Sequence, residues 1–138
     1  MTEHKNAELA RHAFDALNSG DRAVIRQYLH EDVVFTMSGS SPAVGLPNAV
    51  IRGLPALLSA FENVGQFTQG LFRFSVQSVL ADANGAAVVS HNTARREAKS
   101  LDLRMVLLLR IEDNKVVAIT EFPQQAQDWV NFWTEGGE

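Results

Sequence analysis

The chain has 138 residues, of which 46% are hydrophobic, so it is long enough for one compact domain with its own core. Its 12 Lys and Arg residues stand against 16 Asp and Glu residues, which gives a formal net charge of -4. This balance disfavours binding to nucleic acid or to an anionic membrane, because both need clustered positive charge. The count of 0 Cys excludes disulfides, thiolate metal sites and cysteine nucleophiles.

Helical patterns open the chain. Apolar residues between Ala10 and Leu17 recur at helical spacing, and Gly20 suits a left-handed cap at the end of that helix. Asp21 can cap a second helix that ends near Leu29. Two consecutive helices are therefore predicted before the first strand.

One strand, one loop and a third helix follow. Residues 33–37 are short and β-branched, which predicts a strand. Residues 38–53 are rich in Gly, Ser and Pro and predict a loop. Pro55 suits the first turn of a third helix. The residues that this helix would bury are Leu57, Leu58, Phe61 and Val64.

The second half of the chain reads as four antiparallel strands. Three of them are predicted over residues 71–80, 86–95 and 101–111, and the fourth ends near Phe122. The Asn84-Gly85 pair between the first two strands indicates a hairpin, because both residue types tolerate positive φ.

Helices grouped on one face of an antiparallel sheet define an α+β domain, here covering residues 1–138. We expect a strongly curved sheet wrapped around the helices, which leaves a cone with an internal pocket. The segment Met1–Lys5 has no apolar stretch behind it of the kind that marks a signal peptide, so the expected setting is cytoplasmic.

Four local phrases carry a resemblance to a known superfamily. They are Leu17–Asp21, Tyr28–Phe35, the pair Gly39 and Gly45, and Arg110–Val117. Their order resembles the nuclear transport factor two-like superfamily, and within it the SnoaL-like polyketide cyclase and ketosteroid isomerase group. This resemblance implies a cystatin-like, ketosteroid isomerase-like cone. It leaves function open, since this superfamily hosts isomerases, dehydratases, cyclases, epoxide hydrolases and binders without activity.

The resemblance also locates the catalytic positions of the isomerases. Their general base matches Thr36, and their two oxyanion-hole donors match Leu107 and Ala13. None of the three residues present here can do that work. Steroid isomerisation by that mechanism is therefore not expected.

Analogy with the isomerases places Leu107 on the inner face of its strand, and alternation extends this to the neighbouring strands. His91 and Glu121 then both point into the cone. Histidine moves protons near neutral pH. Burial raises the pKa of a carboxyl such as Glu121 unless a partner such as His91 lowers it again. We therefore predict a cofactor-free acid/base couple suited to enolisation, dehydration or aldol-type ring closure.

The substrate-binding residues expected around this couple lie on the inner face of the sheet or the inner side of the helices. They are Phe14, Leu17, Tyr28, Val34, Thr36, Val89, Thr93, Met105, Leu107 and Ile119. The sequence has no metal-ligand spacing and no phosphate-binding glycine motif, so neither a metal nor another cofactor is expected.

Val106 and Leu108 share the opposite face of their strand, which predicts a homodimer through the outer sheet face. Trp129 and Trp133 would anchor a C-terminal helix over residues 124–133, cover the pocket, or join that interface. Three hypotheses stay open. The leading one is an isomerase, cyclase or dehydratase acting on an apolar oxygenated molecule, and the others are a ligand-binding protein without turnover and a dimeric interaction domain.

Overall fold

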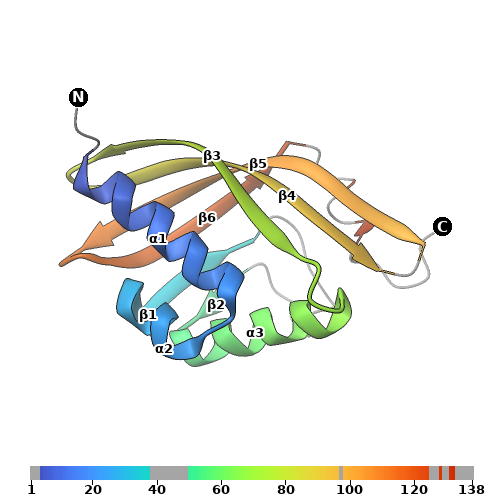
Figure 1. Cartoon of the computed structure of the whole chain (residues 1–138). Coiled ribbons are helices and arrows are strands. Elements are labelled where there is room, and N and C mark those ends of the chain that lie inside the picture. Colours follow the sequence, from blue (N-terminus) through green and yellow to red (C-terminus); the bar gives the residue numbers. More distant parts are fainter. Residues whose placement is uncertain (1–3, 38–49, 97, 125–127, 129–130, 133–138) are drawn as a thin grey trace.

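The computed structural model describes residues 4–37, 50–96, 98–124, 128 and 131–132, which form three helices and one six-stranded sheet (Figure 1). In chain order the elements are α1 (Lys5–Ser19), α2 (Arg22–Tyr28), β1 (Leu29–Thr36), β2 (Val50–Arg52), α3 (Leu54–Phe67), β3 (Arg73–Asp82), β4 (Gly85–Arg96), β5 (Lys99–Glu112) and β6 (Lys115–Pro123). Within this described part, no helix has the length and hydropathy needed to cross a bilayer.

The sheet has the strand order β2-β1-β6-β5-β4-β3. All neighbours are antiparallel except β1 and β6, which pair in parallel. Figure 1 shows the sheet curving around α1, with α3 on the same side beside β1 and β2. This is the α+β cone with a strongly curved sheet that the sequence predicted, and the prediction is confirmed.

The core lies on the concave side of the sheet. Along β5, buried residues alternate strictly with exposed ones, and Met105 and Leu107 are among the buried set. Ile119 and Glu121 of β6 are also buried, at 1% and 3% exposure. The predicted facing of these two strands is therefore confirmed. Phe14 of α1 packs against them from inside the cone and is fully buried.

The junction between α1 and α2 follows the predicted cap chemistry. Gly20 adopts a left-handed conformation with φ of 71°, and its N–H donates to the Ala16 carbonyl over 3.2 Å. Asp21 Oδ1 accepts from the N–H groups of Ala23 and Val24 at 3.0 and 3.3 Å. The two helices are thus joined by one tight turn.

The β3–β4 hairpin forms where expected, but for a different physical reason. The turn lies one residue earlier, with Asp82 paired to Gly85, and Asp82 Oδ1 accepts from the N–H groups of Asn84 and Gly85. Neither Asn84 nor Gly85 is among the positive-φ residues of the described chain. Gly85 is required because a Cβ there would lie 1.9 Å from the Leu109 carbonyl oxygen.

Two differences concern the segment around the predicted loop over residues 38–53. β1 begins at Leu29, ahead of the expected start, and the end of that loop forms β2, which pairs with β1. A three-residue edge strand carries too short a pattern to be recognised from sequence. The predicted anchors Trp129 and Trp133 lie outside the described residues, whereas Phe132 is described and buried.

Candidate functional site

β4 presents the face opposite to the one predicted. Val88, Ser90 and Asn92 have 0% exposure and point into the cone. His91 is half-buried and pairs in register with exposed Arg104 of β5. The predicted inward orientation of His91 is therefore wrong.

His91 belongs to the convex face of the sheet. Its Nε2 is hydrogen-bonded to the Asp102 carboxylate, whose side chain is 73% exposed. Glu121 is paired in register with Leu107, which is fully buried on the concave side. His91 and Glu121 thus lie on opposite faces of the sheet, and the predicted acid/base couple does not form.

The correct facing of β4 leaves a weak trace in the sequence. Ala86, Val88 and Ala94 occupy alternate positions that share one face of the strand, while charged Arg95 lies on the other face. Alternation alone would have put Arg95 outside, and His91 with it. The polar residues in the middle of β4 obscure this pattern, since both faces carry them.

The predicted inward orientation of His91 implied that its neighbours Ser90 and Asn92 point outward, whereas both point into the cone. Ser90 Oγ donates to Asn92 Oδ1 over 2.7 Å, and Asn92 Nδ2 lies 3.4 Å from Met105 Sδ. Both are fully buried. They form a closed polar pair inside the cone, because each partner satisfies a group of the other.

Glu121 remains as the acidic group of the interior. It borders an apolar cavity of about 30 Å³, which we call the inner chamber. Among the described residues that line this chamber, Glu121 is the only polar side chain; the others are Phe35, Met37, Ile51, Leu57, Ala60, Phe61, Val64, Phe72 and Phe74. A cavity of this volume holds about one or two waters or a small functional group.

The predicted substrate-binding residues divide between the two faces. Five lie on the concave side or inside the cone, namely Phe14, Leu17, Met105, Leu107 and Ile119. Two of the remaining five are on β4. Val89 pairs with Val106 and Thr93 with Asp102, so both lie on the convex face with His91.

The other three lie on or beside β1. Val34 pairs with exposed Arg52, and Thr36 pairs with Thr120, which alternates with buried Glu121. Both therefore face outward, and the isomerase base position at Thr36 lies outside the cone. Tyr28, at the end of α2, packs against the His12 ring at a centroid distance of 5.8 Å. The predicted pocket roles of these three residues are not supported by their positions.

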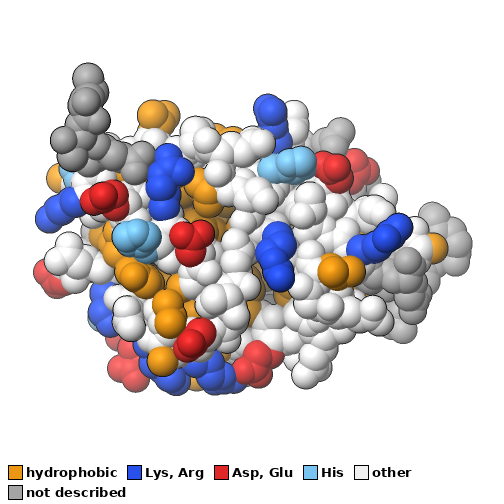
Figure 2. Space-filling view, in the orientation of Figure 1, with side chains coloured by type: hydrophobic (Ala, Val, Ile, Leu, Met, Phe, Trp, Pro, Cys, Tyr) orange, Lys and Arg blue, Asp and Glu red, His pale blue; other side chains and the backbone are white. Residues whose placement is uncertain are grey.

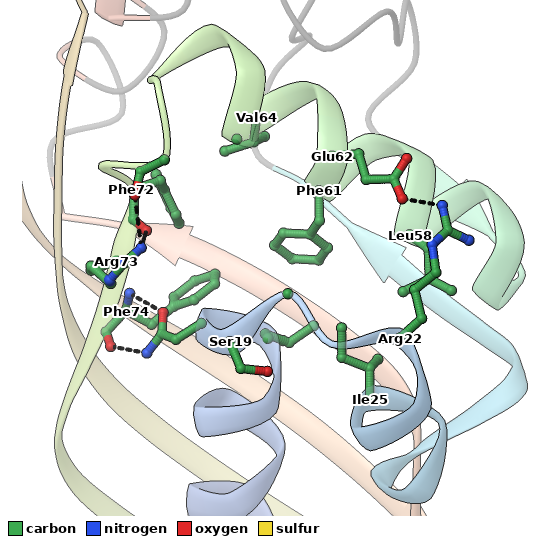
Figure 3. Close-up of a pocket in the computed structure, with 15 residues that line it drawn as sticks. Ser19, Arg22, Ile25, Leu58, Phe61, Glu62, Val64, Phe72, Arg73 and Phe74 are labelled. Carbon is green, nitrogen blue, oxygen red and sulfur yellow. Dashed lines mark hydrogen bonds and ion pairs between the residues drawn. The ribbon is translucent and has the colours of Figure 1, made fainter.

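A larger cavity lies on the other side of the chamber wall (Figure 3). This outer cleft has a volume of about 350 Å³ and lies between the end of α1, the start of α2, α3 and the start of β3. Four side chains line both cavities, namely Phe61, Val64, Phe72 and Phe74. The inner chamber and the outer cleft are therefore adjacent and share these apolar side chains as part of their lining.

The convex face of the sheet carries an exposed apolar patch. Leu80, Val106, Leu108 and Phe122 are 78, 38, 47 and 51% exposed. Val106 pairs with Phe122 across β5 and β6, and Leu108 pairs with Ala87, which in turn pairs with Leu80. The patch is therefore continuous across neighbouring strands.

Acidic and basic side chains are interspersed over the face shown in Figure 2. Within the described residues, no group of three His, Cys, Asp or Glu side chains could hold a metal ion. The enclosed carboxyl of Glu121 is thus the feature of the interior that bears on chemistry.

Comparisons with known proteins agree with the fold. The SnoaL-like domain family matches residues 10–119. The uncharacterized protein Rv0034 of Mycobacterium tuberculosis is 24% identical over 134 residues, which cover 96% of this chain and 99% of that protein. The structure of Bal32a, from a soil-derived mobile gene cassette, is 26% identical with a TM-score of 0.86, covering 94% of this chain and 97% of Bal32a. IdmH of Streptomyces antibioticus, proposed to be a polyketide cyclase, shares the fold at 16% identity and a TM-score of 0.74, covering 88% of this chain and 93% of IdmH.

Proposed function

This chain belongs to the SnoaL-like domain family, and on that premise we propose that it binds an apolar, oxygen-bearing small molecule and performs cofactor-free acid/base chemistry on it with Glu121. The carrying observation is that Glu121, at 3% exposure, is the only polar side chain among the described residues of the inner chamber. The shared fold with IdmH, proposed to be a polyketide cyclase, supports a cyclase-type reaction among the isomerase, cyclase and dehydratase alternatives.

A single carboxyl can serve both halves of such a reaction. Glu121 would remove a proton from the carbon beside a carbonyl group and return it to another atom of the same molecule. The proton balance then closes without a second titratable residue. Apolar walls such as Phe35 and Leu57 keep water from competing for that proton.

The size of the chamber limits what enters it. About 30 Å³ admits the reacting end of a substrate and no more. The rest of a larger molecule would have to lie outside the chamber. A small ketone is therefore the most informative first probe, because its carbonyl group and the adjacent carbon can enter the chamber while the rest of the molecule stays outside.

Proton exchange tests the proposal without the natural substrate. Cyclopentanone in deuterated buffer loses its α-proton signals in ¹H NMR when a base exchanges them. We expect the native protein to accelerate this exchange, and we expect Glu121→Gln to lower the acceleration by about 100-fold or more. Glu112→Gln is the matched control, because it neutralises an exposed carboxylate on the convex face.

Ketone binding is measured alongside by saturation-transfer NMR. Equal exchange rates in the native protein and Glu121→Gln would refute the acid/base proposal. If the ketone still bound in that case, the protein would be a ligand-binding protein without turnover. Loss of exchange with retained binding would assign the proton transfer to Glu121.

The convex face supports a second role, that of a homodimer interface. Leu80, Leu108 and Phe122 expose about half or more of their surface, at 78, 47 and 51%. Contiguous exposed apolar surface of this kind is typical of protein interfaces. We propose that a second copy of the chain covers this patch.

Light scattering on a sizing column tests the dimer. Leu108→Lys places a charge at the centre of the patch and is expected to shift the protein to monomer. Leu71→Lys is the matched control, since Leu71 is 51% exposed but lies between α3 and β3, outside the strands that carry the patch. A native protein that is monomeric at high concentration would refute the interface.

A further inference from the structure

The outer cleft has the dimensions of a ligand site. Its volume of about 350 Å³ lies within the range of about 300–1,000 Å³ that small-molecule pockets occupy. It is more than ten times the volume of the inner chamber, at about 350 against 30 Å³. A drug-sized molecule can therefore be accommodated in the cleft without any rearrangement of the chamber.

The floor of the cleft is apolar and aromatic. Phe74 makes edge contacts with Phe61 and Phe72, at ring centroid distances of 6.2 and 5.1 Å. The aliphatic floor residues are Leu17, Ile25, Leu58 and Val64. Figure 3 shows these side chains converging on the cleft from α1, α2, α3 and β3. Such a surface favours a flat apolar or aromatic body.

The walls of the cleft are tied together. Asn18, in the last turn of α1, donates from Nδ2 to the Phe74 carbonyl over 2.7 Å. Asn18 Oδ1 also accepts from the Phe74 N–H over 2.9 Å. The Asn18 side-chain amide thus bonds to both backbone groups of Phe74, near the start of β3. The separation between α1 and β3 is fixed before any ligand binds.

The rim carries more positive than negative charge. Arg22 forms an ion pair with Glu62 across the cleft, and their side chains are 46 and 54% exposed. Arg73 donates from one terminal nitrogen to the Gly70 and Phe72 carbonyls at 3.0 and 2.8 Å. The described lining residues of the cleft therefore include two arginines and one carboxylate, in a chain whose formal net charge is -4.

We infer that the outer cleft is a binding site for a small organic anion with an apolar body. The rings of Phe61, Phe72 and Phe74 hold the body, and the anionic group lies at the rim with Arg22 and Arg73. Glu62 competes with the ligand for Arg22, because both are anions. The site is distinct from the proton-transfer role of Glu121 and does not depend on it.

Two fluorescent probes separate the charge from the apolar body. The aromatic sulfonate 1-anilinonaphthalene-8-sulfonate carries both features, and N-phenyl-1-naphthylamine carries the same rings without the sulfonate. We expect Arg22→Gln to weaken sulfonate binding by about two- to fivefold, as the loss of an exposed charge pair does. We expect Glu62→Gln to strengthen it by a similar factor.

The decisive feature of this test is that Arg22→Gln and Glu62→Gln are expected to change sulfonate affinity in opposite directions. Both substitutions break the same ion pair, so a purely structural role of that pair would change sulfonate affinity in one direction. The neutral probe is expected to bind both variants as it binds the native protein. Glu121→Gln is expected to change neither probe, which keeps this result separate from the fate of the acid/base proposal.

Arg110→Gln and Glu112→Gln provide the matched control, because this ion pair is also exposed, at 66 and 60%, but lies on the convex face. If Arg110→Gln weakened sulfonate binding and Arg22→Gln did not, the probe would lie on the convex face of the sheet, and the inference would be overturned. Equal or same-sign effects of Arg22→Gln and Glu62→Gln would overturn it as well. Circular dichroism of each variant verifies that the fold is retained.

Discussion

The inner chamber and the outer cleft share one wall but differ in what their other walls provide. The chamber has a volume of about 30 Å³ and is bordered by the buried Glu121 and by apolar side chains. The cleft offers about 350 Å³ and an exposed Arg22–Glu62 pair at its rim. An apolar surrounding strengthens the interactions of a proton-transferring group, whereas an exposed charged rim suits recognition. The larger cavity and the buried acid are therefore different sites, although Phe61, Phe72 and Phe74 line both cavities.

The largest expected effect comes from removing one of these shared rings. Phe74 is 5% exposed and contacts the rings of Phe14, Phe61 and Phe72. We expect Phe74→Ala to lower the free energy of unfolding by about 3–5 kcal/mol, because it leaves a cavity between the two sites. Urea unfolding followed by fluorescence or circular dichroism measures this change.

Phe72→Ala is the comparison variant, since Phe72 borders both cavities but is only half-buried. We expect a smaller loss in the free energy of unfolding, about 1–2 kcal/mol. Equal losses for the two variants would show that Phe74 is not the central residue of the shared wall.

A smaller effect is expected at the turn that positions the cleft. Asp21 caps α2, whose first residue is Arg22. Asp21→Ala should lower the free energy of unfolding by about 1 kcal/mol, because two N–H groups lose their acceptor. Asp15→Ala, at an exposed position in α1, serves as the control. Thermal unfolding of both variants measures this difference. An equal loss in the free energy of unfolding for Asp15→Ala would contradict the capping role of Asp21.

The smallest effect on stability is expected at the rim. The Arg22–Glu62 pair is about half exposed on each side, so breaking it should change the free energy of unfolding by less than about 1 kcal/mol. Added salt should remove most of that contribution. A double-mutant cycle with Arg22→Gln and Glu62→Gln measures the coupling. A coupling well above this size would mean that the pair has a structural role.

The sequence was most informative where charge and apolar character alternate. On β5, charged Asp102 and Arg104 alternate with Leu103 and Met105, so the facing of that strand could be predicted correctly. The caps at Gly20 and Asp21 are local chemistry and were equally predictable. The resemblance to the SnoaL-like group supplied the fold.

β4 shows where sequence reasoning failed. Ser90, His91 and Asn92 are all polar, so alternation does not distinguish the two faces of the strand at this point. Analogy placed His91 inside, whereas register with β5 places it beside Asp102 on the outside. Burial of Ser90 and Asn92 is possible because they satisfy one another.

The two cavities could not have been predicted from any one segment. Phe35, Phe61 and Phe74 come from a strand, a helix and another strand that are far apart in the sequence. Their contacts depend on the curvature of the sheet and the position of α3. On α3 itself, Leu57 borders the inner chamber while its neighbour Leu58 borders the outer cleft.

Because Leu57 and Leu58 border different cavities, their methyl groups report directly whether a ketone binds in the inner chamber. Selective ¹³C labelling of Leu and Met methyl groups allows intermolecular nuclear Overhauser effects from bound cyclopentanone to be assigned. If the ketone binds in the chamber, we expect contacts to the methyl groups of Leu57 and Met37, both of which line the chamber with Glu121. Contacts confined to Leu58, or to Leu108 on the convex face, would contradict it.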